Sequence, residues 1–477
     1  MKERLELTVT IDFGSTFTKV AAFDLNAERL IAVAQSKTTV STDITNGLNK
    51  ALEELDKTIS PVKYSITRMM ASSSAAGGLK MAAIGLTKAL TTKAAQEAVL
   101  GAGAKLNGTY SFRLNPEDLV EIEGKAPDII LLAGGTDGGN EKNILYNAHM
   151  LSNSRIKAPI IIAGNRNACQ QVESILKIKG KQCLSTKNIM PELDTLNIQP
   201  TQTIIRELFI KQITNAKGLN RARSLTGDII MPTPSAVLKA AELLSKGTSE
   251  EPGIGDLLLV DIGGATIDIH SVGAGLPSDV STILKGLPEP LEKRTVEGDL
   301  GIRFNADSIL EHIGIGALVS KIVDVDGEAP TSATIDEYIG KITQNVEYIP
   351  AHAKESVIDT CLASKALEIA SYRHAGTIES MNSPTGSYKV QRGKDLTKFP
   401  TIIGTGGILA KSTAPETILK ATLYNHHYPE KLLPVSPLVS LDSNYILHSI
   451  GLLESLSSSK ALRIIKKSLS NCPPFKN

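Results

Sequence analysis

The sequence predicts an α/β protein whose core is built twice. Residues 7–23 and 257–270 share one design: a strand that ends in Asp and Gly, a turn with hydroxyl side chains, and a second strand. Three more strands, within 127–132, 158–163 and 399–405, run into glycine-rich loops. A chain of 477 residues is also too long for one compact core. We therefore expect two lobes of similar core, each presenting a phosphate-binding hairpin to a shared cleft.

The composition excludes several functional classes. A net charge of +1, no long Lys/Arg run, no Trp and 4% aromatic residues argue against nucleic-acid binding. No apolar run approaches the ~20 residues that span a bilayer, and the N-terminus has no signal-peptide core. The four cysteines contain no C-x-x-C pair, so neither a zinc site nor a disulfide framework is indicated. We expect a cytoplasmic protein that binds neither nucleic acid nor membrane.

The first hairpin has the sequence DFGSTFTKVAAF. Its strand ends at Asp12, and the turn contains Gly14, Ser15 and Thr16, with Lys19 close behind. Backbone N–H groups of the turn and the charge of Lys19 suit an anionic ligand. The alternative is a plain hairpin with a glycine turn and a solvated lysine.

The second hairpin, 257–270, begins with an apolar run that ends at Asp261. Gly263 and Gly264 let the backbone approach a polyphosphate, and a carboxylate beside them suits a hydrated Mg²⁺. The strand resumes with Thr266. This pattern is also that of an ordinary tight hairpin, but its repetition 249 residues after Asp12 favours phosphate binding.

Between the hairpins, helical periodicity covers about 45–58, and 71–78 is a run of small residues. The strands within 127–132 and 158–163 are expected to be parallel neighbours in an α/β sheet. Whether the glycine loop 134–140 contacts a nucleotide, a partner or nothing is left open. Prolines and Thr233 in 231–241 indicate a helix start.

After the second hairpin, the alternating charges of 293–301 are typical of a solvated loop. Helices are expected at 305–322 and 354–372. The glycine turn of 399–409 would let an adenine or ribose lie against bare backbone. A last helix is expected at 442–453, capped by Asp442 or Ser443.

The ordered segments DFGSTFTK, PTPSAVLKAA, LLLVDIGGATID, IIGTGGILA and the Asp-led helix with Ser449-Ile450-Gly451 resemble the five motifs of the actin/Hsp70/sugar-kinase ATPase superfamily. The resemblance implies a two-lobed actin/Hsp70-like ATPase core of ribonuclease H-like domains with insertions, and ATP and Mg²⁺ as cofactors. It implies close approach of the two hinge helices at Ala236 and Gly451.

The resemblance also implies residue roles. Asp12 and Asp261 would hold Mg²⁺ through its water shell, Lys19 would offset phosphoryl charge, and Asp12, Asp261 or Asp268 would orient water. The cofactor contacts would come from Gly14, Ser15, Thr16, Thr18, Gly263, Gly264, Thr266, Gly404, Gly406 and Gly407.

The same likeness divides the chain. Residues 1–247 would form lobe I, with an inserted α/β segment at about 60–230 and the first connecting helix. Residues 248–438 would form lobe II, and residues 439–477 would return to lobe I with the second connecting helix.

More narrowly, SSSAAGGLKMAAIGL, LLAGGTDGGN, VDIGGATIDIHS, KRTVEGDLGIR and YRHAGT resemble the MutL/GlmL-type accessory proteins of glutamate mutase. These are unrelated to the mismatch-repair protein of similar name. The resemblance implies that the partners are subunits of an adenosylcobalamin-dependent mutase, either glutamate mutase or an aminomutase. It implies ATP-linked release of damaged cobalamin from that mutase.

The chain also contains one cobalamin-like motif and lacks cysteines typical of related iron–sulfur proteins. Asp268 to Gly273 matches the Asp-x-His-x-x-Gly signature of cobalamin ligation, but it lies on the return strand of the second hairpin and lacks the downstream Gly-Gly. We interpret the match as chance, so that the chain itself does not carry the coenzyme. No cysteine stands where related iron–sulfur activators place their cluster ligands.

The predicted function is a slow Mg²⁺-dependent ATPase that opens and closes two lobes with nucleotide state. One alternative is a small-molecule kinase on the same core, although no sugar-kinase substrate motif is found. The other is a non-catalytic actin- or Hsp70-like assembly factor.

Overall fold

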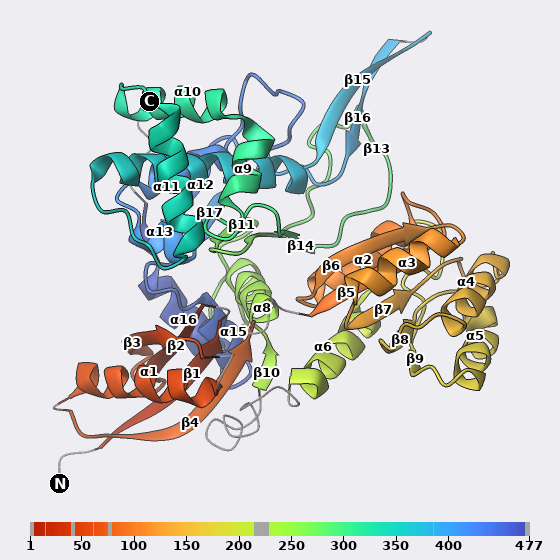
Figure 1. Ribbon diagram of the computed structural model, residues 1–477, viewed down its shortest axis with the longest axis horizontal. Coiled ribbons are helices and arrows are strands. Elements are labelled where there is room, and N and C mark those ends of the chain that lie inside the picture. The colour runs from red at the N-terminus through yellow and green to blue at the C-terminus, as the bar shows by residue number, and fades with distance from the viewer. Residues whose placement is uncertain are drawn as a thin grey trace. The chain divides into compact units, whose positions relative to one another are not determined.

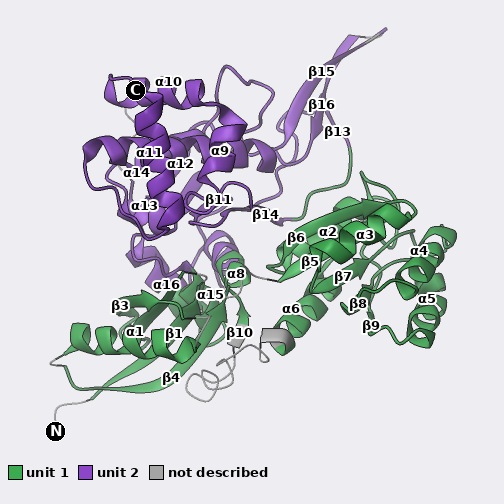
Figure 2. Ribbon diagram, viewed as in Figure 1, with its two compact units in different colours: residues 1–239, 286–290, 448–461 green, residues 240–285, 291–447, 462–477 purple. Residues whose placement is uncertain are grey.

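The computed structural model describes residues 4–14, 16–39, 43–60, 62–74, 79–213, 229–384 and 386–472. The chain divides into two compact units (Figure 2). Unit 1 contains residues 1–239, 286–290 and 448–461, and unit 2 contains residues 240–285, 291–447 and 462–477. The first change of unit therefore falls inside helix α8 (Thr233–Lys246) and not at residue 247, and residues 462–477 belong to unit 2.

The first sheet of unit 1 has the strand order β10-β4-β1-β2-β3 (Figure 1). Its strands are β1 (Leu5–Phe13), β2 (Phe17–Asp24), β3 (Arg29–Lys37), β4 (Tyr64–Ser73) and β10 (Ile229–Pro232). Strands β1, β2 and β3 form an antiparallel meander, and β4 and β10 extend the sheet on the other side of β1 as parallel strands. Because β4 pairs with β1, the insertion starts after residue 73, later than the predicted position near 60.

Strand alternation separates the two faces of this sheet. The odd-numbered residues of β1 from Leu7 to Phe13 are buried in one cluster with Leu48, Ala51 and Leu55 of α1 (Ile44–Ile59). The side chain of Asp43 caps this helix by accepting the Thr45 N–H at 2.9 Å. The helix predicted at 45–58 is confirmed. Thr10 and Asp12 consequently lie on the face away from α1.

The inserted segment of unit 1 is an all-parallel sheet of order β6-β5-β7-β8-β9 with helices between its strands. The strands are β5 (Lys80–Gly85), β6 (Lys105–Ser111), β7 (Ile129–Leu132), β8 (Ile160–Ile162) and β9 (Cys183–Ser185). The helices are α2 (Thr91–Gly101), α3 (Pro116–Lys125), α4 (Lys142–Ser152), α5 (Arg166–Ile178) and α6 (Gln199–Ile213). The predicted parallel pairing of neighbours β7 and β8 is confirmed.

The main sheet of unit 2 has the order β14-β12-β11-β17-β18-β19. Its strands are β11 (Leu257–Ile262), β12 (Ile267–Val272), β14 (Glu292–Glu297), β17 (Thr401–Thr405), β18 (Leu438–Leu441) and β19 (Ser470–Asn471). Strands β14, β12 and β11 are antiparallel, and β17 and β18 follow in parallel. This is the same internal order as in unit 1, so the predicted fold class, two ribonuclease H-like α/β domains with an insertion, is confirmed.

Helices cover the apolar face of this sheet, where Leu258, Val260 and Ile262 are buried. They are α9 (Ala306–Ile313), α10 (Ile315–Asp326), α11 (Ser332–Gln344), α12 (Ala353–His374), α13 (Gly407–Lys411), α14 (Pro415–Leu419) and the 3₁₀ turn η2 (Lys420–Thr422). The helix expected at 305–322 is interrupted at Gly314, whose φ of +74° no α-helix accommodates. A separate sheet contains β13 (Thr282–Leu284) and the long hairpin β15 (Thr377–Ser383) and β16 (Gly386–Arg392), as Figure 1 shows.

The C-terminal part contains α15 (Leu447–Leu453) and α16 (Ser458–Ser468). The last connecting helix thus starts at Leu447, five residues later than predicted, because Asp442 caps the preceding turn by accepting the N–H groups of Ile446 and Leu447. In the described part of the chain, no helix is long and apolar enough to cross a membrane.

Candidate functional site

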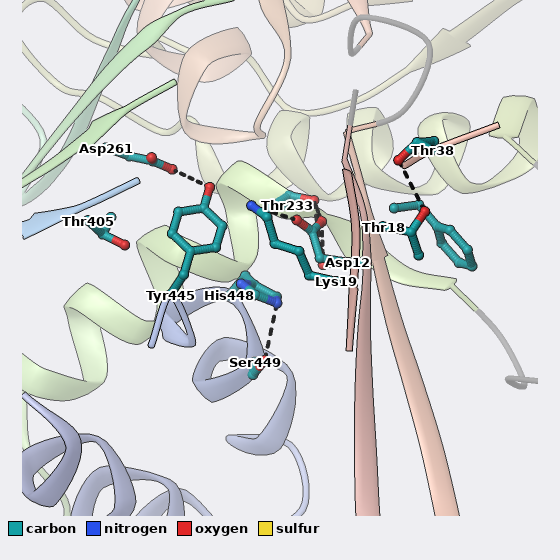
Figure 3. Close-up of polar contacts among 12 residues, drawn as sticks. Asp12, Thr18, Lys19, Thr38, Thr233, Asp261, Thr405, Tyr445, His448 and Ser449 are labelled. Carbon is teal, nitrogen blue, oxygen red and sulfur yellow. Dashed lines mark hydrogen bonds and ion pairs between the residues drawn. The ribbon is translucent and has the colours of Figure 1, made fainter. Parts of the chain in front are cut away.

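The first predicted carboxylate, Asp12, is the penultimate residue of β1 and lies on the polar face of the unit 1 sheet. Its side chain is 2% exposed, and Lys19 lies directly opposite on β2. The Lys19 Nζ is 4.0 Å from Asp12 Oδ2 (Figure 3). The Thr233 hydroxyl, from the first residue of α8, donates to Asp12 Oδ1 at 2.5 Å. The structure therefore brings two predicted residues, Asp12 and Lys19, together with one that the sequence had only marked as a helix start.

The turn after Asp12 is closed by a hydrogen bond from Gly14 N–H to the Phe17 carbonyl at 3.1 Å. A Cβ at Gly14 would lie 2.5 Å from that carbonyl oxygen, so only glycine fits. The carbonyl of Thr16 accepts the N–H of Thr38 at 2.9 Å, which ties the turn to the residue after β3. Ser15 lies outside the described residues.

Thr18 lies on the other face of β2. It is the register partner of Phe13, whose side chain is in the α1 core, and its hydroxyl is 3.1 Å from the Thr38 hydroxyl. Figure 3 shows Thr18 and Thr38 on the far side of the strands from Asp12. Because the side chain faces away from Asp12 and Lys19, a phosphate contact through the Thr18 hydroxyl does not fit this geometry.

His448, the second residue of α15, is the titratable neighbour of this carboxylate that the sequence did not reveal. Burial lowers the pKa of His448 to about 4, with Asp12 acting to raise it and Lys19 to lower it further. The imidazole is neutral near pH 7 and contacts the Ser449 hydroxyl at 3.2 Å. The groups around Asp12 therefore include one cation, Lys19, and neutral polar side chains.

The second predicted carboxylate, Asp261, occupies the matching position at the end of β11 in unit 2. Its turn is closed by the Gly263 N–H, which donates to the Thr266 carbonyl at 2.9 Å. The Tyr445 hydroxyl donates to Asp261 Oδ2 at 3.4 Å (Figure 3). Tyr445 has a φ of +54°, a strained conformation for an aromatic residue, and such strain is concentrated at functional sites.

The three glycines at the end of β17 and just after it differ in their roles. A Cβ at Gly406 would lie 2.7 Å from Asp261 Oδ1 and 2.4 Å from the Ile262 carbonyl, and its φ is +102°. Gly407 is exposed with open space around it. A Cβ at Gly404 would instead meet three leucine methyl groups at 2.9–3.1 Å. Gly404 is thus a core position, and the predicted adenosine contact fits only the two glycines that follow it.

Asp268, the register partner of Asp261, is committed to other groups. Arg294 Nε and Nη2 donate to its Oδ1 at 2.8 and 2.5 Å, and the Thr266 hydroxyl donates to its Oδ2 at 3.0 Å. Burial would raise the pKa of Asp268, but the charges and hydrogen bonds around it, led by Arg294, hold the pKa below its usual value. The geometry assigns Asp268 and Thr266 to bracing the hairpin and does not favour the orientation of water by Asp268 or a phosphate contact by the Thr266 hydroxyl.

A second brace holds the Gly263–Gly264 turn. The N–H groups of Arg303 and Phe304 both donate to the Gly264 carbonyl at 2.9 Å. The Arg303 guanidinium is itself fixed by Asp359 at 2.8 and 2.9 Å.

The expectation of a solvated loop at 293–301 is wrong for its first residues, since Lys293 and Arg294 are buried on β14.

Comparison with known proteins identifies the family. The model of the MutL protein family matches residues 8–469. The chain is also 44% identical over 467 residues to Protein MutL of Clostridium tetanomorphum, covering 98% of this chain and 99% of the relative. The chain belongs to the MutL family. The recognition made from its motifs is confirmed.

Several solved structures are similar over nearly the whole MutL-family chain. One is the ligand-bound xylulose kinase of Lactobacillus acidophilus, at 14% identity, with 99% of this chain and 94% of that chain covered and a TM-score of 0.36. Another is a glycerol dehydratase reactivase, at 11% identity, with 95% and 100% covered and a TM-score of 0.33. The assignment of fold rests on the strand order described above and on family membership.

Both carboxylates suit the cofactors that the superfamily resemblance implies. Mg²⁺ keeps several waters and is usually bound by one or two carboxylates together with phosphate oxygens. Asp12 and Asp261 are each the penultimate residue of a strand. An added Cβ would collide at Gly14, in the turn after β1, and at Gly406, in the turn after β17 that contacts Asp261. Among the described residues, no group of three or more His, Cys, Asp or Glu side chains is placed to hold a metal ion.

Two other sequence features have structural explanations. His270 of the Asp-x-His-x-x-Gly match is 1% exposed in the middle of β12, and its Asp268 is bound to Arg294, so the segment is not presented as a cobalt ligand. The glycine loop 134–140 is held by two buried asparagines. Asn165 accepts the Gly138 N–H at 3.2 Å, and Asn188 donates to the Gly135 carbonyl at 3.0 Å.

Proposed function

We propose that this MutL-family protein is a slow Mg²⁺-dependent ATPase that serves an adenosylcobalamin-dependent mutase as its accessory protein. The observation that carries the ATPase half is the duplicated hairpin. Two sheets of the same strand order each place a carboxylate near the end of a central strand, just before a glycine turn. An added Cβ would lie 2.5 Å from a backbone oxygen at Gly14 and 3.1 Å from one at Gly263. A nucleotide bound through both turns would link two units whose residues alternate along the chain.

The chain's own residues have distinct tasks in this proposal. Asp12 and Asp261 hold the hydration shell of Mg²⁺, and Lys19 offsets charge on the transferred phosphoryl group. The turns at Gly14 and Gly263 donate backbone N–H groups to the phosphates, and Gly406 and Gly407 leave room for the adenosine. When bound, Mg²⁺ neutralises phosphate charge. Because both carboxylates serve one metal, ATP favours the closed arrangement of the units and hydrolysis releases it.

The mutase half of the proposal rests on family membership and on the resemblance of the motifs to glutamate mutase accessory proteins. Nucleotide-driven opening and closing would pull the partner away from a damaged cobalamin. The candidate partners are subunits of glutamate mutase or of an aminomutase.

The ATPase half is tested by Asp12→Ala and Asp261→Ala. We expect the ATP turnover rate of each variant to fall about 100-fold or more, because the carboxylate that positions the metal is removed. Circular dichroism should show that each variant keeps the wild-type fold. Glu6→Ala is a matched control, since Glu6 is an exposed carboxylate on the same strand as Asp12. Unchanged hydrolysis in both variants would refute the ATPase assignment. Turnover that requires an added acceptor would indicate a kinase.

The mutase half is tested with glutamate mutase subunits loaded with hydroxocobalamin. We expect cobalamin to be released into the filtrate in the presence of Mg·ATP, but not with ADP or with the Asp12→Ala variant. ATP hydrolysis without any release, from this mutase and from an aminomutase, would refute the partnership and leave the ATPase intact.

A further inference from the structure

Two hydroxyl groups converge on one oxygen of Asp12. The Thr233 hydroxyl donates to Oδ1 at 2.5 Å, and the Ser72 hydroxyl donates to the same oxygen at 3.3 Å. The two hydroxyls are themselves 3.5 Å apart. Thr233 is 7% exposed and Ser72 is fully buried, so these contacts are shielded from solvent. Asp12 Oδ1 is therefore held by two buried hydroxyl groups.

Backbone pairing imposes this convergence. Ser72 on β4 is the register partner of Asp12 on the parallel neighbour β1. The next strand, β10, pairs Met231 with Ser72 and Pro232 with Ser73, and α8 begins at the following residue, Thr233. Three segments separated in sequence are thus aligned by one sheet, and the first side chain of the helix is delivered to the end of β1.

The chemistry of the two donors suits a metal-binding carboxylate. A hydroxyl fixes the orientation of a carboxylate through a hydrogen bond but adds no charge, unlike an arginine or lysine. Asp268 provides the contrast within the same chain, because the Arg294 guanidinium takes up one of its oxygens. Asp12 is oriented by neutral groups at Oδ1, with the Lys19 ammonium 4.0 Å from Oδ2.

We propose that Thr233, supported by Ser72, is a positioning residue that holds the Asp12 carboxylate in the orientation required for the water shell of Mg²⁺. This inference rests on the proposed ATPase function. Thr233 acts through Asp12 and not on the nucleotide. Its hydroxyl reduces the number of orientations that the Asp12 carboxylate samples. The carboxylate is therefore already oriented for the metal's water shell before the metal binds.

The test compares Thr233→Val, Thr233→Ser and Thr10→Val. Valine keeps the shape of threonine and loses the hydroxyl, whereas serine keeps the hydroxyl. Thr10 is a matched control, because it is a buried hydroxyl on the same face of β1 that bonds to Ser449 at 2.7 Å and not to Asp12. Two readouts are taken: steady-state hydrolysis against Mg²⁺ concentration, and calorimetric binding of ADP with and without Mg²⁺.

For Thr233→Val we expect kcat to fall about 10- to 100-fold and the half-saturating Mg²⁺ concentration to rise about 10-fold. ADP binding without Mg²⁺ should change less than about 2-fold, and Thr233→Ser should recover most of the loss. Thr10→Val should keep the wild-type Mg²⁺ dependence.

The other possible results distinguish failure of the Thr233 positioning role from failure of the ATPase assignment. Wild-type Mg²⁺ dependence in Thr233→Val, or a defect in Thr233→Ser as large as that in Thr233→Val, would overturn the positioning role while the ATPase stands. If the wild-type protein neither binds nor hydrolyses ATP, the proposed function fails. A crystal structure of Thr233→Val then decides the positioning, and an unmoved Asp12 side chain would overturn it.

Discussion

Individual aspartates of the two hairpins acquire different properties from their partners. Asp12 accepts hydrogen bonds from neutral hydroxyls, and Asp268 forms a buried ion pair with Arg294. Since the pKa of Asp268 is depressed, its contribution to stability is present above the usual aspartate range and is lost only as the pH falls through the lower, folded-state value. Residue type alone did not distinguish these two carboxylates.

Three buried histidines give the protein a predictable response to acid. Burial lowers the pKa of His448 to about 4 and that of His270 to about 3, and the pKa of His374 is well below its ordinary value. In the unfolded chain each of them binds a proton near pH 6.5. Between about pH 6.5 and 4 the unfolded chain therefore binds more protons than the folded one, and stability falls as the pH falls.

We expect each of these histidines to cost roughly 2 kcal/mol of unfolding free energy at pH 5 relative to pH 7.5. Urea titrations of the nucleotide-free protein at both pH values measure the difference. His448→Gln should reduce the pH dependence by about a third, whatever it does to stability at pH 7.5. A free energy of unfolding that is flat from pH 7.5 to 5 would contradict the neutral burial of the three rings.

At the scale of elements, the period of the strands decides which residues reach the sites. In β1 and in β11 alternate residues enter the helix-covered core, so Asp12 and Asp261 emerge on the opposite face. Within unit 1, α15 packs against the start of α8, where a Cβ on Gly451 would lie 1.9 Å from the Ala236 carbonyl. Thr10 of β1 also bonds Ser449 of α15. The expected close approach of Ala236 and Gly451 is confirmed.

That contact makes glycine obligatory at position 451 of α15, whereas position 340 of α11 has room for a side chain. We expect Gly451→Ala to destabilise unit 1 by about 3 kcal/mol, because the added methyl group overlaps backbone atoms that cannot move independently. Gly340→Ala in α11 is the control. A Cβ there meets nothing within 4 Å, and alanine should stabilise that helix by up to about 1 kcal/mol.

Chemical denaturation of both variants measures these differences, with circular dichroism reporting the helices. Equal effects of the two substitutions would show that helix propensity, and not the packing of α15 on α8, determines the response. A neutral Gly451→Ala would mean that the two helices separate readily.

At the scale of the whole molecule, the chain builds the same sheet order twice and inserts a parallel α/β sheet into the first copy. The chain passes from one unit to the other inside α8, at the first residues of α15 and within α16. Segment 286–290 also belongs to unit 1, where Leu287 is buried in the core of the insertion and Glu289 pairs with Lys93. The connections are therefore more numerous than the three-part division expected from the sequence.

If one Mg·ATP is held by residues of both units, it must stabilise the folded molecule as a whole. We expect Mg·ATP at about 100 times its dissociation constant to raise the free energy of unfolding by roughly 2.7 kcal/mol. Thermal denaturation with ATP, with and without EDTA, measures the effect, and Asp12→Asn or Asp261→Asn should each remove its metal-dependent part. Stabilisation that persists with EDTA would exclude a role for the metal in joining the units.

The sequence by itself determined the family, the duplicated fold and the two Asp–Gly hairpins, because apolar alternation and glycine turns are local patterns written in consecutive residues. It could not distinguish Gly404 from Gly406, since both belong to the same strand–glycine segment, and only packing shows that one faces leucines and the other a carboxylate. It also missed Thr233, Ser72, Tyr445 and Arg294 as partners of the aspartates. Each reaches its carboxylate through strand pairing or a turn that joins distant segments, and tertiary structure alone decides such contacts.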